Sequence, residues 1–495
     1  MLIRSGLILA VGILLGRLLG FFRETLIASQ FGVSGLADVA ILTLTLPDLF
    51  MNVLLGGAAS IVLVPVFVRL QGAGSAWLHY RISIISALVC VLLAVVVVML
   101  SQPLARLLAP GVTPQTQTQI ALGISWSAWL MPLIACATVT TTWLQALGRF
   151  SVSAFSTLLY NLVLIFVLMF ALSPTQPIVS LAIGMLIAGV LRCFWLWWDT
   201  RPFVNHERAE SLMVKPLLQS YGMALVASSS LFLLPLIGRA MASQTGEGGI
   251  AIFNYASKLV ELPLAVAITL IANVMFATLA HTIQQQPKTW SVMFGQSQRL
   301  VILVAWLITL PAFCFSLPLV KIAFGWGEIS EFHLQQIAIV WQCGLLSLVL
   351  QGVVSLNTVA LAAHHNTRTL ASSSLLGLVS YSGACYLLLP IYGLLGLMGA
   401  LLLAYIIMLI EQWRVLVTRH HLHLSQVLNV RFLCTLMLML LVTIPMWFLG
   451  SYLNLHIVAA VFVAIAHVLL LLGVLFMVQP EIRAMAKPLL RAREA

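Results

Sequence analysis

Charged residues are scarce in this chain of 495 residues, where Asp, Glu, Lys and Arg together make up only 7%. Soluble globular domains carry about a quarter of such residues, so the composition excludes a soluble globule. Hydrophobic residues make up 62% of the sequence, and the mean hydropathy is +1.10. We therefore expect an all-α, multi-pass membrane protein built from helices of about 20 residues.

Signatures of catalysis and of cofactor binding are also missing. The seven cysteines stand singly without a Cys-x-x-Cys pair, and we expect them to be small apolar core residues. The tract His420-His421-Leu422-His423 has no acidic or thiol neighbour, so it predicts a solvated or lipid-facing loop. No phosphate loop, catalytic triad, dinucleotide fingerprint or zinc spacing occurs. We expect no enzyme, no bound metal or cofactor, and no nucleic-acid partner.

Long uncharged windows set the number of membrane spans. Five windows of 36 to 49 residues contain no Asp, Glu, Lys or Arg, and each is long enough for two spans and a turn. Fourteen spans are predicted, at 5–30, 36–68, 82–108, 118–147, 151–172, 178–199, 216–243, 249–281, 294–318, 334–363, 369–390, 394–417, 430–450 and 456–478. The first apolar segment carries Arg17 and Arg23 and lacks a small-residue cleavage site, so we expect it to remain as a helix rather than a cleaved signal.

The basic residues set the orientation. With a cytoplasmic N-terminus, 18 of the 24 Lys and Arg fall at cytoplasmic loops or helix ends, as the positive-inside rule requires. Arg192 is counted among those 18. Both termini are therefore predicted to be cytoplasmic.

A weak internal repeat divides the chain. A shift of 216 residues superposes Arg23 on Arg239, Gly32 on Gly248 and Leu46-Pro47 on Leu262-Pro263, with Asp38 on Asn254. Each copy covers the first two helices of a six-helix set, so the repeat is parallel and favours a substrate site between two lobes. The predicted domains are an N-lobe at 1–200, a linker at 201–215, a C-lobe at 216–418, and a final helix pair with a basic C-terminus at 419–495.

Charged groups within apolar spans are the candidate functional residues, because they are costly in a bilayer unless they face a partner or a wet cavity. Arg17 and Arg23 lie six residues apart on the first helix, so both can border one wide cavity. The alternative is that they form structural bridges with Glu24, Asp38 or Asp48. For Asp38, at the start of the second helix, capping of that helix is an equal alternative.

The seventh and eighth helices carry Arg239, Lys258 and Glu261. Lys258 and Glu261 are i,i+3 neighbours, so either they contact substrate or ion, or they neutralise each other. Glu411 and Arg414 have the same spacing near a cytoplasmic end and predict a structural pair. Arg106 and Lys321, near outward ends, are expected to extend to the headgroups.

Two stretches resemble the MviN/MurJ family. They are GRLLGFFRETLIASQFGVSGLADVAILTLTLPDLFMNVLLGGAASIVLVPVF, from position 16, and NYASKLVELPLAVAITLIANVMF, from position 254. The resemblance implies the fold of the multidrug/oligosaccharidyl-lipid/polysaccharide (MOP) exporter superfamily, with two six-helix lobes in a V around a central cationic cavity. Helices 13 and 14 would add a groove for a polyprenyl tail. The implied activity is flipping of an undecaprenyl-diphosphate-linked sugar, lipid II for the family's namesake, across the bacterial inner membrane.

By this resemblance the cationic positions of the cavity fall on Arg17, Arg23 and Lys258. The acidic or turn positions fall on a further set: Asp38, Asp48, Glu261 and Pro47. The chain departs from the family where Met51-Asn52 replaces a common pair of arginines, where Ser257 replaces Asp, and where Lys258 replaces Arg. An Arg fork and a Lys point charge grip a diphosphate differently, so an exopolysaccharide or O-antigen repeat unit remains an alternative cargo.

The leading hypothesis is a secondary flippase that moves a polyprenyl-diphosphate-linked saccharide, foremost lipid II for peptidoglycan synthesis, from the cytoplasmic to the periplasmic leaflet. We expect it to act as a monomer among membrane lipids. Arg17, Arg23 and Lys258 would hold the diphosphate, with Arg239 near the outward exit. The lobes would rock about Pro47 and Pro263 and about glycine-rich stretches. Those stretches include Gly32 and Gly248. Membrane potential, or an exchanged sodium ion or proton, would reset the cycle.

Two other functions are less favoured. A cation-coupled drug exporter would share the fold but have an acidic, aromatic cavity and no thirteenth and fourteenth spans. A membrane-embedded glycosyltransferase or polymerase would need carboxylates in a sizeable outward loop. The longest such loops, around 241–249 and 319–333, offer only Glu247, Glu328 and Glu331.

Overall fold

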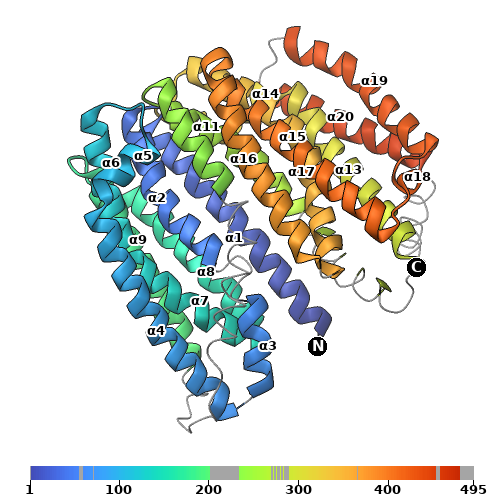
Figure 1. Cartoon of the computed structure of the whole chain (residues 1–495). Coiled ribbons are helices and arrows are strands. Elements are labelled where there is room, and N and C mark those ends of the chain that lie inside the picture. The colour runs from blue at the N-terminus through green and yellow to red at the C-terminus, as the bar shows by residue number, and fades with distance from the viewer. Residues whose placement is uncertain are drawn as a thin grey trace, which may run out of the picture. The chain divides into compact units, whose positions relative to one another are not determined.

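The computed structural model is helical along almost the whole of the described chain (Figure 1). It describes residues 2–54, 60–70, 72–200, 233–268, 271–272, 275, 279, 282–283, 289–364, 366–452 and 457–479, and no strand occurs among them. The chain divides into two compact units. Unit 1 is Met1–Tyr255 with Gly327–Ser330, and unit 2 is Ala256–Trp326 with Glu331–Ala495. The predicted inter-lobe linker at 201–215 lies outside the described residues.

Unit 1 contains the helices of the N-terminal half. They are α1 (Leu2–Phe31), α2 (Gly35–Leu54), α3 (Ser60–Leu70), α4 (Gly72–Met99), α5 (Ser101–Leu108), α6 (Pro114–Ala128), α7 (Leu130–Ala146), α8 (Phe150–Phe166), the π-helix η2 (Val167–Ala171), α9 (Pro177–Thr200) and the short 3₁₀-helix η4 (Ser243–Thr245). A further helical stretch covers 233–242. Helix α11 (Gly249–Pro263) begins in unit 1, and the division falls after Tyr255.

Unit 2 holds the remaining helices. After the π-helix η5 (Leu264–Ile268) come α13 (Trp290–Cys314), α14 (Ser316–Phe324), α15 (Glu331–Ala363), α16 (Thr367–Tyr392), α17 (Leu394–His420), α18 (Leu424–Val427), α19 (Val430–Tyr452) and α20 (Ile457–Val478).

Twelve helices of the described residues are long and apolar enough to cross a membrane, so the chain is a multi-pass membrane protein. They correspond to twelve of the fourteen predicted spans. Of the other two, 5–30 forms helix α1, and only residues 233–243 of the span 216–243 are described. The count of fourteen therefore stays a prediction.

Proline sets three interruptions within predicted spans. Helices α4, α6 and α13 end at Met99, Ala128 and Cys314, and each of these residues stands four positions before a proline. A proline ring clashes with the carbonyl of the residue four positions earlier, so the chain bends and a second helix follows. The boundary predicted for the third span was also wrong at its start: helix α4 begins at Gly72, ten residues before the predicted position 82.

A row of glycines on α1 allows close packing against α8. A Cβ added at Gly12 would lie 2.5 Å from the Cβ of Ala154, whereas one at Gly16 or Gly20 would meet α8 at 3.8 to 4.0 Å. The Asn161 amide donates to the Gly16 carbonyl at 3.4 Å. At Gly16 and Gly20 the space next to α8 is thus that of ordinary van der Waals contact, and the closest approach of the two helices is one turn earlier, at Gly12.

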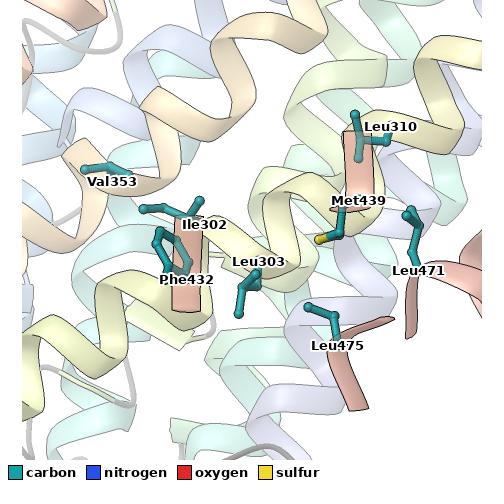
Figure 2. Close-up of a cluster of buried hydrophobic side chains, with 8 residues drawn as sticks. All are labelled: Ile302, Leu303, Leu310, Val353, Phe432, Met439, Leu471 and Leu475. Atoms are coloured by element: carbon teal, nitrogen blue, oxygen red, sulfur yellow. The ribbon is translucent and has the colours of Figure 1, made fainter. Parts of the chain in front are cut away.

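The core of unit 2 joins the last two helices to α13. Figure 2 shows Ile302, Leu303 and Leu310 of α13 beside side chains of α15, α19 and α20. The cluster is completed by Val353, Phe432, Met439, Leu471 and Leu475. A buried polar contact also lies between the last two helices, where Thr443 Oγ1 and His467 Nε2 are 3.1 Å apart. The final helix pair is thus packed into unit 2 rather than attached loosely.

Candidate functional site

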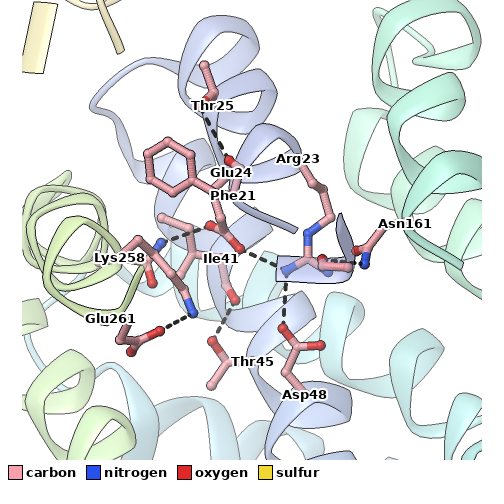
Figure 3. Close-up of polar contacts among 12 residues, drawn as sticks. Phe21, Arg23, Glu24, Thr25, Ile41, Thr45, Asp48, Asn161, Lys258 and Glu261 are labelled. Atoms are coloured by element: carbon pink, nitrogen blue, oxygen red, sulfur yellow. Dashed lines mark hydrogen bonds and ion pairs between the residues drawn. The ribbon is translucent and has the colours of Figure 1, made fainter. Parts of the chain in front are cut away.

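Arg23 on α1 lies at the centre of a buried ionic cluster in unit 1. Its Nη2 is 2.8 Å from Glu24 Oε1 and 3.2 Å from Asp48 Oδ2 of α2 (Figure 3). Arg23 and Glu24 are almost fully buried, whereas the Asp48 side chain is 32% exposed. The alternative of structural bridges therefore describes Arg23 in this state, and only Asp48 offers the cluster an accessible edge.

The cluster continues through hydrogen bonds to the seventh and eighth helices. Glu24 Oε2 accepts from the Asn254 amide at 3.1 Å, and Asn254 Oδ1 accepts from Arg239 Nε at 3.0 Å. Arg239 and Asn254 are both buried. Two arginines and two carboxylates are thus linked in one chain, Arg239–Asn254–Glu24–Arg23–Asp48. Because opposite charges balance within it, burial of these groups is tolerated.

Asp38 caps a helix, but not the one on which it lies. Ser34 caps α2, since its Oγ accepts from the Ala37 N–H at 3.2 Å. The Asp38 carboxylate, fully buried, instead accepts from the Gly248 N–H at 2.7 Å and the Ala251 N–H at 2.8 Å, at the start of α11. A carboxylate there satisfies two free N–H groups and interacts favourably with the helix dipole. Capping of its own helix, one of the two interpretations from sequence, is wrong.

The connections before α2 and α11 exchange reciprocal contacts, as expected of a repeat. Gly32 and Gly248, which the 216-residue shift superposes, both have positive φ, at 62° and 84°. While Asp38 of α2 binds the Gly248 N–H, Tyr255 of α11 donates its hydroxyl to the Gly32 carbonyl at 3.0 Å. The two copies of the sequence repeat therefore also correspond in local structure, at the connections that contain Gly32 and Gly248.

Glu247 fastens the segment before α11 to α6. Its Oε1 accepts from the Thr113 and Thr116 hydroxyls at 2.9 and 2.8 Å, and the Ser243 hydroxyl accepts from the Gly111 N–H at 3.3 Å. Glu247, which the sequence offered as a loop carboxylate for a glycosyltransferase, is thus engaged in structural hydrogen bonds.

Arg17 differs from the other arginines of the candidate site. Its side chain is exposed, and among the described residues no carboxylate lies within ion-pair distance. Arg17 and Arg23, six residues apart on α1, are thus an accessible cation and a paired cation.

The candidate residues of unit 2 form a local pair. Lys258 Nζ is 2.8 Å from Glu261 Oε2 on α11, so the two neutralise each other (Figure 3). Both are partly exposed, with side chains 23% and 39% accessible. Pro263 follows directly and ends α11, after which the chain continues as η5. In α2, by contrast, Pro47 lies within a continuous helix. The hinge roles of both prolines stay predictions.

Other charged residues form the structural contacts expected at helix ends. Arg414 and Glu411 are 3.8 Å apart, which confirms that pair. Lys321, expected to extend to the headgroups, is instead paired with Glu331.

The thiols and imidazoles form no metal site among the described residues. All seven cysteines are free, and Cys434 alone is exposed. His420, in the predicted solvated tract, stacks on His364 with ring centroids 3.9 Å apart.

Arg192 was misplaced by the positive-inside count. It lies inside α9, eight residues before its end, and is 5% exposed, with Nη1 3.3 Å from the Met51 sulfur. The count treated every basic residue near a span end as a loop residue. The available signal was position 192 itself, which is inside the predicted span 178–199. Tyr160 of α8, also buried beside this region, carried no sequence signal of its own.

The fold is similar to that of solved membrane transporters. A solved structure of a lipid II flippase, MurJ in an inward closed conformation, aligns with a TM-score of 0.78 at 18% identity, covering 95% of this chain and 99% of that one. A MOP superfamily transporter from Pyrococcus furiosus aligns with a TM-score of 0.63 at 13% identity, covering 85% and 96%. The chain therefore has the fold of a MOP superfamily membrane transporter.

The sequence places it more narrowly. The profile of the family described as lipid II flippase MurJ matches residues 27–468, so the chain belongs to that family. Relatives include a lipid II flippase MurJ of Burkholderia cenocepacia, 26% identical over 68% of this chain and 69% of its own length. A probable lipid II flippase MurJ of Helicobacter pylori is 23% identical over 75% of this chain and 86% of its own length.

Proposed function

We propose that this protein flips lipid II from the cytoplasmic to the periplasmic leaflet of the bacterial inner membrane, for peptidoglycan synthesis. Family membership over residues 27–468 supports the activity. The observation that links this activity to a site is the exposed Arg17, six residues before the buried Arg23 on the same helix. A guanidinium binds phosphate oxygens through short, charge-assisted hydrogen bonds, and two adjacent cations suit a diphosphate.

In this proposal Arg17 makes the first contact, and Arg23 exchanges Asp48 for a phosphate oxygen. The Arg23–Asp48 contact is the longer of its two ion pairs, at 3.2 Å, and Asp48 is the exposed partner. Lys258 would likewise release Glu261, and Arg239 would act near the outward exit. No catalytic step is needed, since transport moves the substrate unchanged.

Resetting of the transporter needs a driving force. We propose that membrane potential, or an exchanged sodium ion or proton, restores the inward-open state, because moving one charge across 100 mV is worth about 2.3 kcal/mol. The cytoplasmic location of both termini and action as a monomer belong to the same proposal.

A different lipid-linked saccharide is the second candidate cargo. Neither Met51 nor Asn52 on α2 is basic, and Asn52 is exposed. An exopolysaccharide or O-antigen repeat unit also carries a polyprenyl diphosphate, so the same cations would serve it.

The deciding experiment is depletion in the native cell, followed by analysis of polyprenyl-linked intermediates on the cytoplasmic leaflet. Accumulated lipid II with lysis is the expected result; viable cells lacking a surface polysaccharide would establish the second cargo. With purified protein in liposomes, Arg17→Ala and Arg23→Ala should each slow translocation at least about tenfold. Arg106→Ala is the matched control, as an exposed helical arginine outside the cluster. Wild-type rates in both arginine variants would refute the assigned site.

A further inference from the structure

Arg192 of α9 is a buried cation that has no counter-ion among the described residues. Its side chain is 5% exposed, and within the described part of the chain its hydrogen-bond partner is the Met51 sulfur, at 3.3 Å. Its Nε is buried without an acceptor, and no carboxylate of the described residues lies within 4.0 Å. Asp48 is instead paired with Arg23, and Asp199, seven residues further along α9, is paired with Arg149.

A buried guanidinium without a counter-ion is unfavourable unless another group neutralises its charge. Guanidinium stays charged in proteins, and a weak sulfur acceptor replaces little of its hydration. Buried charges are normally paired, because an unpaired one costs several kcal/mol. The other buried arginines among the described residues of unit 1 are Arg23 and Arg239, and each has an oxygen atom as a hydrogen-bond partner. Arg192 is therefore the anomaly of this unit.

Two further unsatisfied donors lie in the same region. The Tyr160 hydroxyl of α8 is buried without a hydrogen-bond partner, and Arg23 Nε is likewise buried without an acceptor. Tyr160 is close enough to Arg23, Asp48 and Arg192 to interact electrostatically with all three. Among the described residues of α1, α2, α8 and α9, three buried donors therefore have no acceptor, while the carboxylates Glu24 and Asp48 are already paired with Arg23.

We propose that Arg192 is a substrate-binding residue of the flippase, a guanidinium supplied by α9 that contacts the diphosphate once Met51 moves aside. The inference rests on the proposed function and adds one residue to its site. Met51 suits the role of a movable cover, because an unbranched thioether has several low-energy rotamers and a weak hold on the cation. A diphosphate oxygen would offer Arg192 the strong acceptor that it lacks, and the Tyr160 hydroxyl can donate to the same group.

The relation between Arg192 and Met51 also bears on the cargo. Met51 stands where the MviN/MurJ family commonly has an arginine, and in the structure the Arg192 guanidinium lies against the Met51 side chain. The cation is thus supplied by α9 instead of α2. We infer that the region next to Asp48 binds a diphosphate despite Met51 and Asn52.

The test uses the full-length protein in nanodiscs and measures the Kd for undecaprenyl diphosphate, with uncharged undecaprenol as the control ligand. Arg192→Met should raise the Kd for the diphosphate about tenfold, the loss expected for one charge-assisted hydrogen bond. Binding of undecaprenol should not change. The Tm should stay equal or rise, because the substitution removes an unpaired buried charge, whereas loss of a purely structural arginine would lower it.

A double variant separates charge from scaffolding. Met51→Arg combined with Arg192→Met moves the guanidinium to α2 and leaves the methionine on α9. If the cation binds substrate, the double variant should recover most of the affinity that Arg192→Met loses. An unchanged Kd in Arg192→Met, or a lowered Tm with no recovery in the double variant, would overturn the proposal.

The two proposals fail in different ways. If the wild-type protein binds undecaprenyl diphosphate in an Arg192-dependent manner but does not translocate lipid II, the role of Arg192 is supported and the cargo is wrong. If it translocates lipid II and Arg192→Met does so at the same rate and affinity, the cargo is right and Arg192 has no part in binding.

Discussion

Single charged residues in this protein differ mainly in what they bind. Asp38 accepts two backbone N–H groups at the start of α11 and is fully buried. Arg23 is shared by two carboxylates, and Arg17 is exposed, with no carboxylate of the described residues within ion-pair distance. All three were candidates because they are charged groups within apolar spans, and only their contacts distinguish a structural cap, a paired cation and an accessible cation.

Asp38→Asn should therefore destabilise the protein. An asparagine keeps one acceptor oxygen and turns an NH₂ group toward a backbone N–H, which leaves a buried donor unsatisfied at a cost of about 1 to 3 kcal/mol. We expect a lower Tm in detergent. The matched control is Asp48→Asn, because Asp48 is partly exposed and makes one ion pair at 3.2 Å. If Asp48→Asn lowered the Tm more than Asp38→Asn, the capping role would be refuted.

At the scale of elements, proline and glycine determine where helices bend and how closely they approach. Prolines four residues past Met99, Ala128 and Cys314 divide predicted spans into two helices each. Small residues serve membrane helices because there is little hydrophobic drive between them, so association depends on close packing. The α1–α8 contact at Gly12 is such a place.

Gly12→Ala should weaken this contact. The added methyl would lie 2.5 Å from the Ala154 Cβ, and relief of the overlap needs a backbone shift costing about 1 to 3 kcal/mol. Gly473→Ala in α20 is the matched control, since no atom lies within 4 Å of its added Cβ. The same substitution there should be neutral or stabilising, because alanine favours helices over glycine by about 1 kcal/mol. Equal Tm changes in the two variants would contradict this account of the α1–α8 interface.

At the scale of the whole molecule, the sequence predicted the all-α membrane class and the place of most helices, because uncharged runs of membrane length have few alternatives to a helix. The contact network was not predictable in detail. Whether Arg23 pairs with Glu24, pairs with Asp48 or faces a cavity depends on the rotation and tilt of its helix, and a hydropathy pattern does not determine these. Arg192 shows the same limit, since counting charges near span ends cannot tell a loop residue from a buried one.

The orientation predicted for the whole chain rests on its loop charges. The positive-inside count assigns 18 of the 24 Lys and Arg to cytoplasmic loops or helix ends, Arg192 among them, and it predicts that the uncharged segment 173–177, where α9 begins, lies on the other side. Thr175 in that segment and His423 beyond α17 are both exposed. Single cysteines at these two positions therefore report opposite faces of the membrane.

The test uses a variant whose seven native cysteines are replaced by alanine or serine. In that background Thr175→Cys should react with a membrane-impermeant maleimide in spheroplasts whose inner membrane is intact. His423→Cys should react only after the membrane is opened, since its loop is predicted to be cytoplasmic. Exposure of both side chains makes the pair comparable, because burial cannot then explain a difference in labelling. The reverse pattern would place both termini outside. The side now assigned as the outward exit would then be cytoplasmic, so the proposed direction of flipping would also have to be reversed.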